Sequence, residues 1–296
     1  MQPGVSHHGK KGEGRKHMRH IINGIIALFV LSLIIYAAVE LKLNIEKDET
    51  MPVISADTES IWVSVNATDE ELMVGLTAKD EKDGDLTSEI VVGNKSKFIK
   101  KGTINVTYVV FDQDNNLAQL TRKVNYLDYE SPKFSLADSL DFYVGEVVSV
   151  LQVLKATDSI DGDITDKIRI ISSDVNNREV GTYSVKVQVS SDYGDTCEIM
   201  LPVNIHANAI NCPTITLTSY MVYLKVGEKI SPEKYISNVV DAYGSAIDKD
   251  SVQIENNVDT ACPGVYQISY TVVDEKGKTG VCNMVVVVEE TLQEEK

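Results

Sequence analysis

Three runs of the chain alternate apolar and polar residues with a period of two. Each run opens on a glycine and ends on an aspartate: GTINVTYVVFD from Gly102, GTYSVKVQVSSD from Gly181 and GVYQISYTVVD from Gly264. The alternating apolar positions are Ile104, Val106, Tyr108, Val110, Tyr183, Val185, Val187, Val189, Tyr266, Ile268, Tyr270 and Val272. A period of two puts these side chains on one face of a β-strand, so each run predicts a strand with one buried face.

An acidic turn precedes each predicted strand. It reads DEKDGD over residues 80–85, DSIDGD over 158–163 and, in a weaker form, DAYGSAID over 241–248. The turns recur at a spacing of about eighty residues, which is the size of a small domain. We therefore predict three domains in tandem, over residues 50–128, 129–207 and 208–290, followed by an acidic tail over 291–296.

Each predicted domain contains about seven short strands separated by Gly, Asp and Asn turns. This spacing is typical of an antiparallel β-sandwich, so the fold class is all-β, with three tandem sandwiches after one N-terminal helix. Residues 285–288 (VVVV) are apolar at consecutive positions. Such a run is either buried on both faces at an interface or lies at an edge that a neighbouring strand covers, and we favour the edge.

Residues 21–39 form an uncharged apolar segment long enough to cross a bilayer as a helix. The preceding tail, residues 1–20, is basic, and the linker over 40–49 is net acidic. The basic flank stays inside, so we predict a single-pass anchor in the cell membrane, with the N-terminus cytoplasmic and the C-terminus extracellular. A cleaved secretory signal is the alternative.

The formal net charge of the chain is −16, and most of it falls after the basic tail. Such an acidic chain repels nucleic acid, so we expect no nucleic-acid partner. The four cysteines, Cys197, Cys212, Cys262 and Cys282, lie in the predicted extracellular part, where disulfides form. Four cysteines allow three pairings. One bridge within residues 208–290 is the favoured interpretation, and a bridge from Cys197 to Cys212 across the domain junction is another.

The turn over residues 158–165 (DSIDGDIT) and the strand over 181–189 (GTYSVKVQV) together resemble bacterial immunoglobulin-like domains. These domains, related to cadherin and hyalin repeats, are strung in tandem along Gram-positive cell-surface proteins. The positions of Tyr183 and Tyr266 resemble the tyrosine corner, in which the phenol bonds to backbone upstream. Ile104 replaces this tyrosine in the first repeat and is expected to be plain core. The resemblance implies a stalk, spacer or adhesive module.

The acidic turns are the candidate chemical sites. Each places three carboxylates within six residues beside a glycine, as hard cations such as calcium require: Asp80, Asp83, Asp85, Asp158, Asp161 and Asp163. A bidentate glutamate at the twelfth position is missing, so any calcium site would be weak. The other interpretation is that these aspartates form Asx turns that cap the following strand. We favour plain turns and keep calcium as the one possible cofactor.

Catalytic interpretations find little support. His206 is the one histidine beyond residue 20, and no phosphate-binding or dinucleotide-binding glycine motif occurs. The single tryptophan, Trp62, lies in the alternating run IWVSV, where we predict a core position and keep sugar stacking as the alternative.

The sequence therefore predicts a non-enzymatic, membrane-anchored bacterial surface protein. Its tandem domains would present a surface for adhesion or protein binding, with a protein or a glycan as ligand. A structural stalk or scaffold within an envelope complex is the alternative function.

Overall fold

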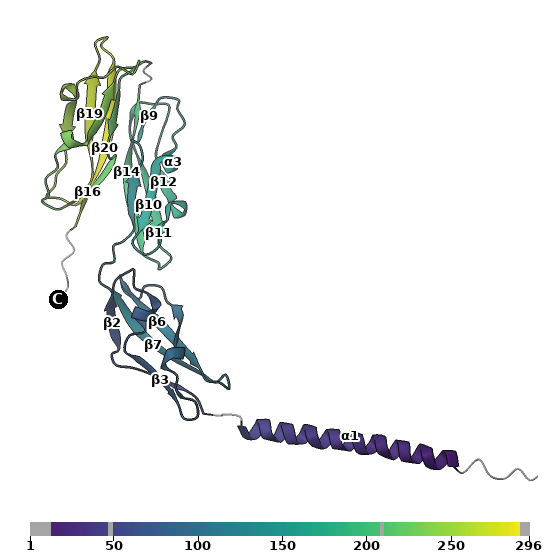
Figure 1. Ribbon diagram of the computed structural model, residues 1–296. Helices are drawn as coiled ribbons and strands as arrows, with labels where there is room; N and C mark the ends of the chain where they lie inside the picture. The colour runs from purple at the N-terminus through teal and green to yellow at the C-terminus, as the bar shows by residue number, and fades with distance from the viewer. Residues whose placement is uncertain (1–12, 47–49, 208–209, 291–296) are drawn as a thin grey trace, which may run out of the picture. The chain divides into compact units, whose positions relative to one another are not determined.

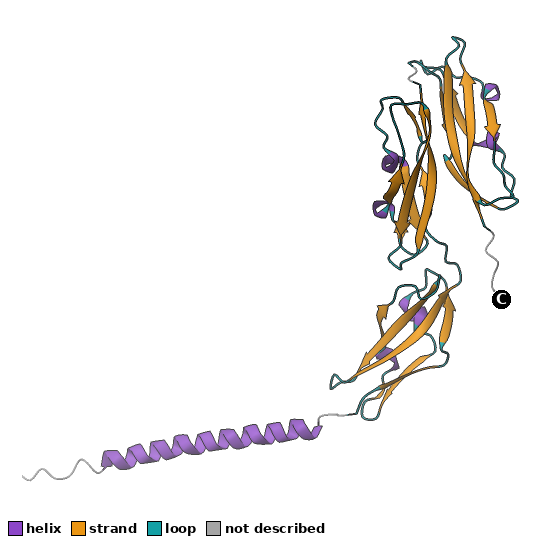
Figure 2. Ribbon diagram, turned by 180° about the vertical axis from the view of Figure 1, so that it is seen from behind, coloured by secondary structure: helices purple, strands orange, loops and turns teal. Residues whose placement is uncertain are grey.

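A computed structural model describes residues 13–46, 50–207 and 210–290. Strands make up most of the chain after residue 50, with one long helix before it (Figure 2). Four short segments lie outside the described residues. They are residues 1–12 of the predicted basic tail, 47–49 of the acidic linker, 208–209 at the second junction and the acidic tail over 291–296.

Helix α1 spans Glu13–Glu46 and is longer at both ends than the apolar segment predicted over 21–39 (Figure 1). Its part Met18–Lys42 is long and apolar enough to cross a membrane, a test that a signal sequence near the N-terminus also passes. The side chains of residues 18–42 are exposed in the structure. An N-terminal apolar helix is therefore present, as predicted.

The chain divides into two compact units. The first comprises residues up to Asp57, Gly75–Val91 and Tyr108–Leu120, and the second comprises Thr58–Val74, Val92–Thr107 and Thr121–Lys296. The predicted domain boundaries after residues 128 and 207 stay predictions, and the strands are described below in the order of the three sequence repeats.

The first repeat contains seven strands in two sheets, with orders β1-β3-β4 and β2-β7-β6-β5. Its strands are β1 (Val53–Ala56), β2 (Ser60–Val63), β3 (Leu76–Asp80), β4 (Gly84–Asp85), β5 (Val91–Lys95), β6 (Thr103–Phe111) and β7 (Leu117–Tyr126). One-turn helices α2 (Asp69–Leu72) and η1 (Thr87–Glu89) lie between them. The alternating residues of β6, from Ile104 to Val110, are fully buried, as their period of two predicts.

The second repeat has the same order of elements, with sheets β11-β10-β8 and β12-β13-β14-β9. Its elements are β8 (Lys133–Leu136), β9 (Asp141–Tyr143), α3 (Val150–Val153), β10 (Leu154–Asp158), β11 (Gly162–Asp163), η2 (Thr165–Lys167), β12 (Arg169–Ser173), β13 (Gly181–Ser190) and β14 (Thr196–His206). The repeat in sequence is thus a repeat in topology.

Over its described residues, 210–290, the third repeat has six strands, in sheets β15-β17 and β16-β20-β19-β18. Its elements are β15 (Thr214–Leu217), β16 (Met221–Lys225), η3 (Pro232–Tyr235), β17 (Ile236–Val240), η4 (Lys249–Ser251), β18 (Gln253–Asn256), β19 (Gly264–Val273) and β20 (Thr279–Glu289). In every repeat the first strand of the four-stranded sheet runs parallel to the last strand, as in β2–β7, β9–β14 and β16–β20. The sandwiches are therefore mixed rather than purely antiparallel.

Strand β20 corrects the interpretation of residues 285–288 as an edge. It lies between β16 and β19, and each of these strands pairs with it. Val286 and Val288 belong to the core of the third repeat, whereas Val285 packs with the core of the second. The edge prediction is wrong because β20 is hydrogen-bonded to a strand on each side, and within the second unit its valines pack into two cores.

The structure also corrects the predicted position of Trp62. Its side chain is 65% exposed, so the predicted core position is wrong. Strand β2 is the edge of its sheet, and alternation puts Trp62 on the same side as Ser60 and away from the half-buried Ile61. The indole therefore lies on the outward face of the sheet.

The tyrosine corners form as the resemblance implied. The hydroxyl of Tyr183 donates to the carbonyl of Glu179 at 3.1 Å, and that of Tyr266 donates to the carbonyl of Cys262 at 3.0 Å. Each partner lies four residues upstream, so the phenol pins the loop that enters the signature strand. Ile104, which replaces this tyrosine in the first repeat, is fully buried as plain core.

Candidate functional site

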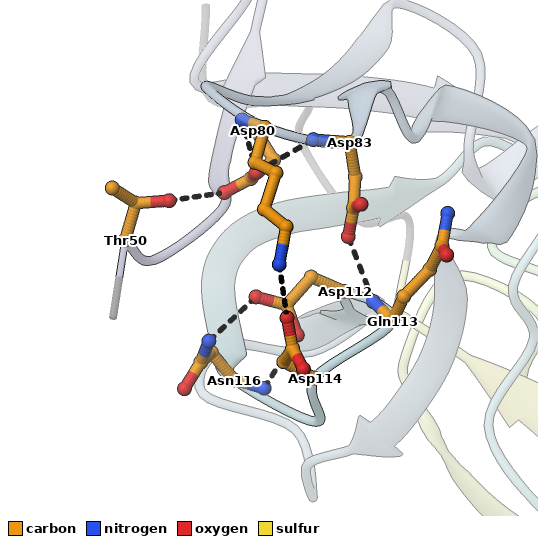
Figure 3. Close-up of polar contacts among 8 residues, drawn as sticks. Thr50, Asp80, Asp83, Asp112, Gln113, Asp114 and Asn116 are labelled. Carbon is orange, nitrogen blue, oxygen red and sulfur yellow. Dashed lines mark hydrogen bonds and ion pairs between the residues drawn. The ribbon is translucent and has the colours of Figure 1, made fainter. Parts of the chain in front are cut away.

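The first acidic turn is organised around the carboxylate of Asp80 at the end of β3. Its Oδ1 accepts the backbone N–H of Lys82 at 2.8 Å and that of Asp83 at 2.9 Å, and Thr50 donates to its Oδ2 at 3.4 Å (Figure 3). Gly84 has a φ of 78°, a left-handed conformation that glycine adopts without strain. The hydrogen bonds from the turn, first that of Asp83, hold the pKa of Asp80 below its ordinary value.

A contact missed at the sequence level joins this turn to the hairpin between β6 and β7. Asp83 Oδ2 accepts the backbone N–H of Gln113 at 2.8 Å, and Lys82 pairs with Asp114 at 2.8 Å (Figure 3). Asp112 shapes the hairpin itself, because its two carboxylate oxygens accept from the backbone and the side chain of Asn116, both at 2.7 Å. The repeated order of acidic turn and hairpin turn was the available sequence signal for this pairing.

The second repeat reproduces the arrangement. Asp158 Oδ1 accepts the N–H groups of Ile160 and Asp161 at 2.9 and 3.0 Å. Asp161 accepts the N–H of Asp192, as Asp83 accepts that of Gln113 in the first repeat. The same role is therefore filled by the acidic residue before the glycine in both repeats.

The last aspartate of each complete acidic turn accepts a hydrogen bond from the first residue of the 3-10 helix that follows. Asp85 Oδ1 accepts the N–H of Thr87 at 3.0 Å, and Asp163 Oδ1 accepts that of Thr165 at 2.9 Å. Hydrogen bonds from the threonine, first from its side chain, lower the pKa of both carboxyl groups. These two aspartates thus stabilise the turn that follows the glycine.

The weaker third turn is built in the same way. Asp241 Oδ1 accepts the N–H groups of Tyr243 and Ser245 at 2.9 and 2.8 Å, which lowers the pKa of Asp241. Lys276 Nζ lies 3.9 Å from the centroid of the Tyr243 ring, a cation–π distance. All three repeats therefore use the first aspartate as the acceptor of an Asx turn.

Asp158 has a further partner. Tyr129 donates to Asp195 Oδ2 at 2.8 Å, its hydroxyl lies 3.3 Å from Asp158 Oδ2, and Ser131 also donates to Asp195. The Tyr129 ring stacks edge-on against Phe98, with centroids 4.6 Å apart. Burial, followed by the two neighbouring carboxylates, raises the pKa of this phenol. Both oxygens of Asp158 are thus already in contact with donors.

This geometry favours the turn interpretation over the calcium interpretation. In the described part of the chain, no three His, Cys, Asp or Glu side chains gather into a group that could hold a metal ion. The inward oxygens of Asp80 and Asp158 accept backbone N–H groups, and a cation would compete with those bonds. Weak calcium binding by Asp80, Asp83, Asp85, Asp158, Asp161 and Asp163 stays a prediction.

The four cysteines are free thiols in this structure. Cys282 is buried in the third repeat, and that burial raises the pKa of its thiol to about 12, whereas Cys262 is exposed. Burial also raises the pKa of Cys197. The pairings predicted for Cys197, Cys212, Cys262 and Cys282 stay predictions.

His206 has a structural partner. Its Nε2 lies 2.9 Å from Asp141 Oδ1, and the Asp141 side chain is 9% exposed. The same carboxylate accepts hydrogen bonds from Asn283 of the third repeat. Sequence reasoning missed this contact, because its members lie on β9, β14 and β20.

Comparison with known proteins gives one family. Residues 218–288 match the family model described as "Bacterial surface protein, Ig-like domain". The chain is 28% identical over 237 residues to the pesticidal crystal protein Cry22Aa of Bacillus thuringiensis, with 77% of this chain covered. It is 27% identical over 193 residues to an uncharacterized 81.3 kDa protein of Acholeplasma phage L2, with 64% of this chain covered. The matches span 32% and 24% of these two relatives, so the chain covers about a third and a quarter of their lengths.

Two solved structures with a similar chain each contain several domains. One contains the M60 catalytic domain with the CBM51-1 and CBM51-2 domains of Clostridium perfringens ZmpB, at 16% identity and a TM-score of 0.24, covering 82% of this chain and 31% of that one. Another contains extracellular cadherin domains 1–4 of protocadherin gamma B7, at 13% identity and a TM-score of 0.21, covering 81% of this chain and 76% of that one. The resemblance carried by the repeated turn and strand is confirmed: the chain contains a bacterial surface Ig-like domain, matched over residues 218–288.

Proposed function

We propose that this chain is a single-pass surface protein that α1 anchors in the cell membrane and that presents its Ig-like domains outside for binding. The observation that carries the proposal is the exposure of α1, whose residues 18–42 contact no core. An apolar helix of this length left in water would be a large exposed hydrophobic surface, and a bilayer removes that surface from water. The lysines and arginines that precede the apolar segment over 21–39 favour a cytoplasmic N-terminus.

The proposed function is non-enzymatic. The carboxylates of the acidic turns accept hydrogen bonds from the turn backbone, and His206 is bonded to Asp141. These groups have structural roles, and the match of residues 218–288 to a bacterial surface Ig-like domain supports a non-catalytic function.

The experiment is a topology measurement on intact bacterial cells that produce the full chain with an epitope tag at each end. External protease is expected to remove the C-terminal tag and to leave the N-terminal tag on a short protected fragment. Loss of the N-terminal tag before protease treatment would identify a cleaved signal, and protection of the C-terminal tag would overturn the proposal.

A charge variant provides the control for this topology. Replacing all five lysines and arginines of residues 1–20 with glutamate removes the positive flank and is expected to reduce the fraction of chains with an external C-terminus; they are Lys10, Lys11, Arg15, Lys16 and Arg19. Glu40→Gln and Glu46→Gln, changes in α1 beyond the apolar segment over 21–39, are expected to leave the topology unchanged, because acidic residues contribute little to orientation.

A scaffold role is the second candidate function, and one observation favours it. Met221 and Val285 of the third repeat pack into the core of the second, so the two repeats form one block rather than independently hinged modules. A scaffold within an envelope complex would need this fixed geometry. Deletion of the gene is then expected to disturb envelope organisation, and an unchanged envelope would contradict the scaffold role.

A further inference from the structure

We propose that the outward face of sheet β2-β7-β6, centred on Trp62, is a carbohydrate-binding site. The face, called the Trp62 face below, consists of Trp62, Thr103, Thr121, Lys123, Asn125 and Leu127. The proposal deepens the proposed function, because it names the ligand class of one presented surface.

The apolar part of the Trp62 face is exposed. Trp62 is 65% exposed and lies opposite Asn125 in the β2–β7 register, and Leu127 is 69% exposed. The N–H of Leu127 donates to the carbonyl of Val63 at 2.9 Å, which keeps Leu127 alongside β2. A ligand that covers the flat indole removes apolar surface from water, which lowers the free energy of the complex. The apolar C–H face of a pyranose ring matches the shape and chemistry of the indole ring.

The polar part is fixed in place by hydrogen bonds within the sheet. Thr103 donates to Asn125 Oδ1 at 3.0 Å, and Asn125 Nδ2 donates to the carbonyl of Ile61 at 3.3 Å. The hydroxyls of Thr107 and Thr121 lie 3.0 Å apart. Each hydroxyl keeps acceptor capacity after its bond, so the face offers oriented polar groups beside the indole. Fixed groups lose little entropy when they bind the hydroxyls of a sugar.

The second repeat shows what the equivalent face does when its partner is a protein. Thr182 donates to Asn204 Oδ1 at 2.9 Å, as Thr103 does to Asn125, and Asp141 lies opposite Asn204 as Trp62 lies opposite Asn125. There Asn204 is buried, and Asp141 binds Asn283 of the third repeat. This position in the fold is therefore one on which another surface docks.

The face of the second repeat is apolar beside its asparagine, as a protein partner requires, whereas the Trp62 face is polar there, as a sugar requires. Two and four residues before Asn204, β14 places Pro202 and Met200, and Val265 of the third repeat lines a hollow together with them. Two and four residues before Asn125, β7 places Lys123 and Thr121. A polar face with one aromatic platform suits a ligand that carries hydroxyls around a small apolar face. The Trp62 face includes one cation, Lys123, and the carboxylate next to it, that of Asp128, accepts hydrogen bonds from Ser64 and from the N–H of Val65, both at 2.8 Å.

The test uses the purified full chain in detergent micelles on an array of oligosaccharides built from hexoses, N-acetylhexosamines and uronic acids. Trp62 is the only tryptophan, so its fluorescence reports on this face alone. We expect at least one class to bind and to shift the emission. Trp62→Ala should weaken that binding roughly tenfold or more, while Trp62→Phe should retain part of it.

The control is Tyr243→Ala, which removes another exposed aromatic ring from the third repeat and should leave binding unchanged. Melting curves of all variants check that they fold. An array without any bound oligosaccharide, binding unchanged in Trp62→Ala, or a ligand of this face that proves to be a protein would each overturn the proposal. The array does not depend on membrane topology, so its failure leaves the anchored-display proposal standing, and the topology measurement tests that proposal by itself.

Discussion

The carboxylate of Asp141 accepts two hydrogen bonds from Asn283, one from its backbone N–H at 2.7 Å and one from its side-chain Nδ2 at 2.6 Å. The two residues lie 142 positions apart, on β9 and β20. His206 contacts the same carboxylate at 2.9 Å. The two donors of Asn283 thus tie the third repeat to this carboxylate, while His206 contacts it from within the second repeat.

Removal of this carboxylate is expected to weaken the contact between the two repeats. Asp141→Ala leaves the polar groups of Asn283 without their acceptor and should cost about 3 kcal/mol. By calorimetry, we expect the unfolding of the third repeat to separate from that of the second and to move to lower temperature. Glu179→Ala, which removes an exposed carboxylate of the second repeat, is the control. An unaltered melting profile in Asp141→Ala would show that the contact contributes nothing.

The tyrosine corner gives a smaller and more local effect. Tyr183→Phe keeps the ring and removes the hydrogen bond to Glu179, so the free energy of unfolding should fall by about 0.5–1 kcal/mol. Urea denaturation of the full chain measures this change. Tyr243→Phe, a change at an exposed ring, should leave the midpoint unaltered, and equal midpoints for both variants would contradict a role for the corner.

The local elements of this fold could be predicted from the sequence. Alternation identified β6, β13 and β19, and the position of Tyr183 identified its corner, because each depends on residues close in the chain. Trp62 was assigned to the core although Ser60 and Ser64 share its side of the alternating run, and that pattern was the available sign of an outward face.

Contacts between distant strands could not be predicted in this way. The pairing of Asp83 with Gln113 depends on how two turns 30 residues apart meet, and that of Asp141 with Asn283 depends on how two repeats pack. Alternation gives the face of a strand but not what covers it. For the same reason the sequence could not decide whether Val285 lay at an edge or at an interface.

Acid is expected to destabilise the turns that Asp80, Asp85 and Asp163 stabilise. Their pKa values are lower in the folded chain than in the unfolded one, because the hydrogen bonds they accept favour the charged form. The unfolded state therefore binds protons first. The three carboxylates contribute their full stabilisation when the pH is above the pKa of an unfolded aspartate, near 3.9. This stabilisation is lost as the pH falls below about 4 and passes through the lower pKa values of the folded chain.

Urea midpoints measured from pH 7 to about pH 2.5 check this dependence. The double variant Asp85→Asn and Asp163→Asn should be less stable at pH 7 and should lose less stability on acidification. Glu275→Gln, in the hairpin turn of the third repeat, should follow the unaltered chain. A double variant with the same pH profile as the unaltered chain would contradict the assignment.

Calcium is expected to leave the melting temperature of the full chain unchanged. The oxygens of Asp80 and Asp158 that face their turns already accept two backbone N–H groups each, and Asp161 accepts the N–H of Asp192. Thermal unfolding in about 1 mM calcium and then in excess chelator measures the difference. A rise of several degrees that Asp83→Asn and Asp161→Asn abolish would instead establish calcium sites at these turns.

Strand β20 has a consequence for how this chain can evolve. Its alternate valines serve two hydrophobic cores, since Val286 and Val288 pack in the third repeat and Val285 packs with the second. A recombination event that moved the third repeat into another protein would leave Val285 in water and Asp141 without Asn283. The second and third repeats are thus expected to be inherited as a pair, although each carries the same order of acidic turn and signature strand.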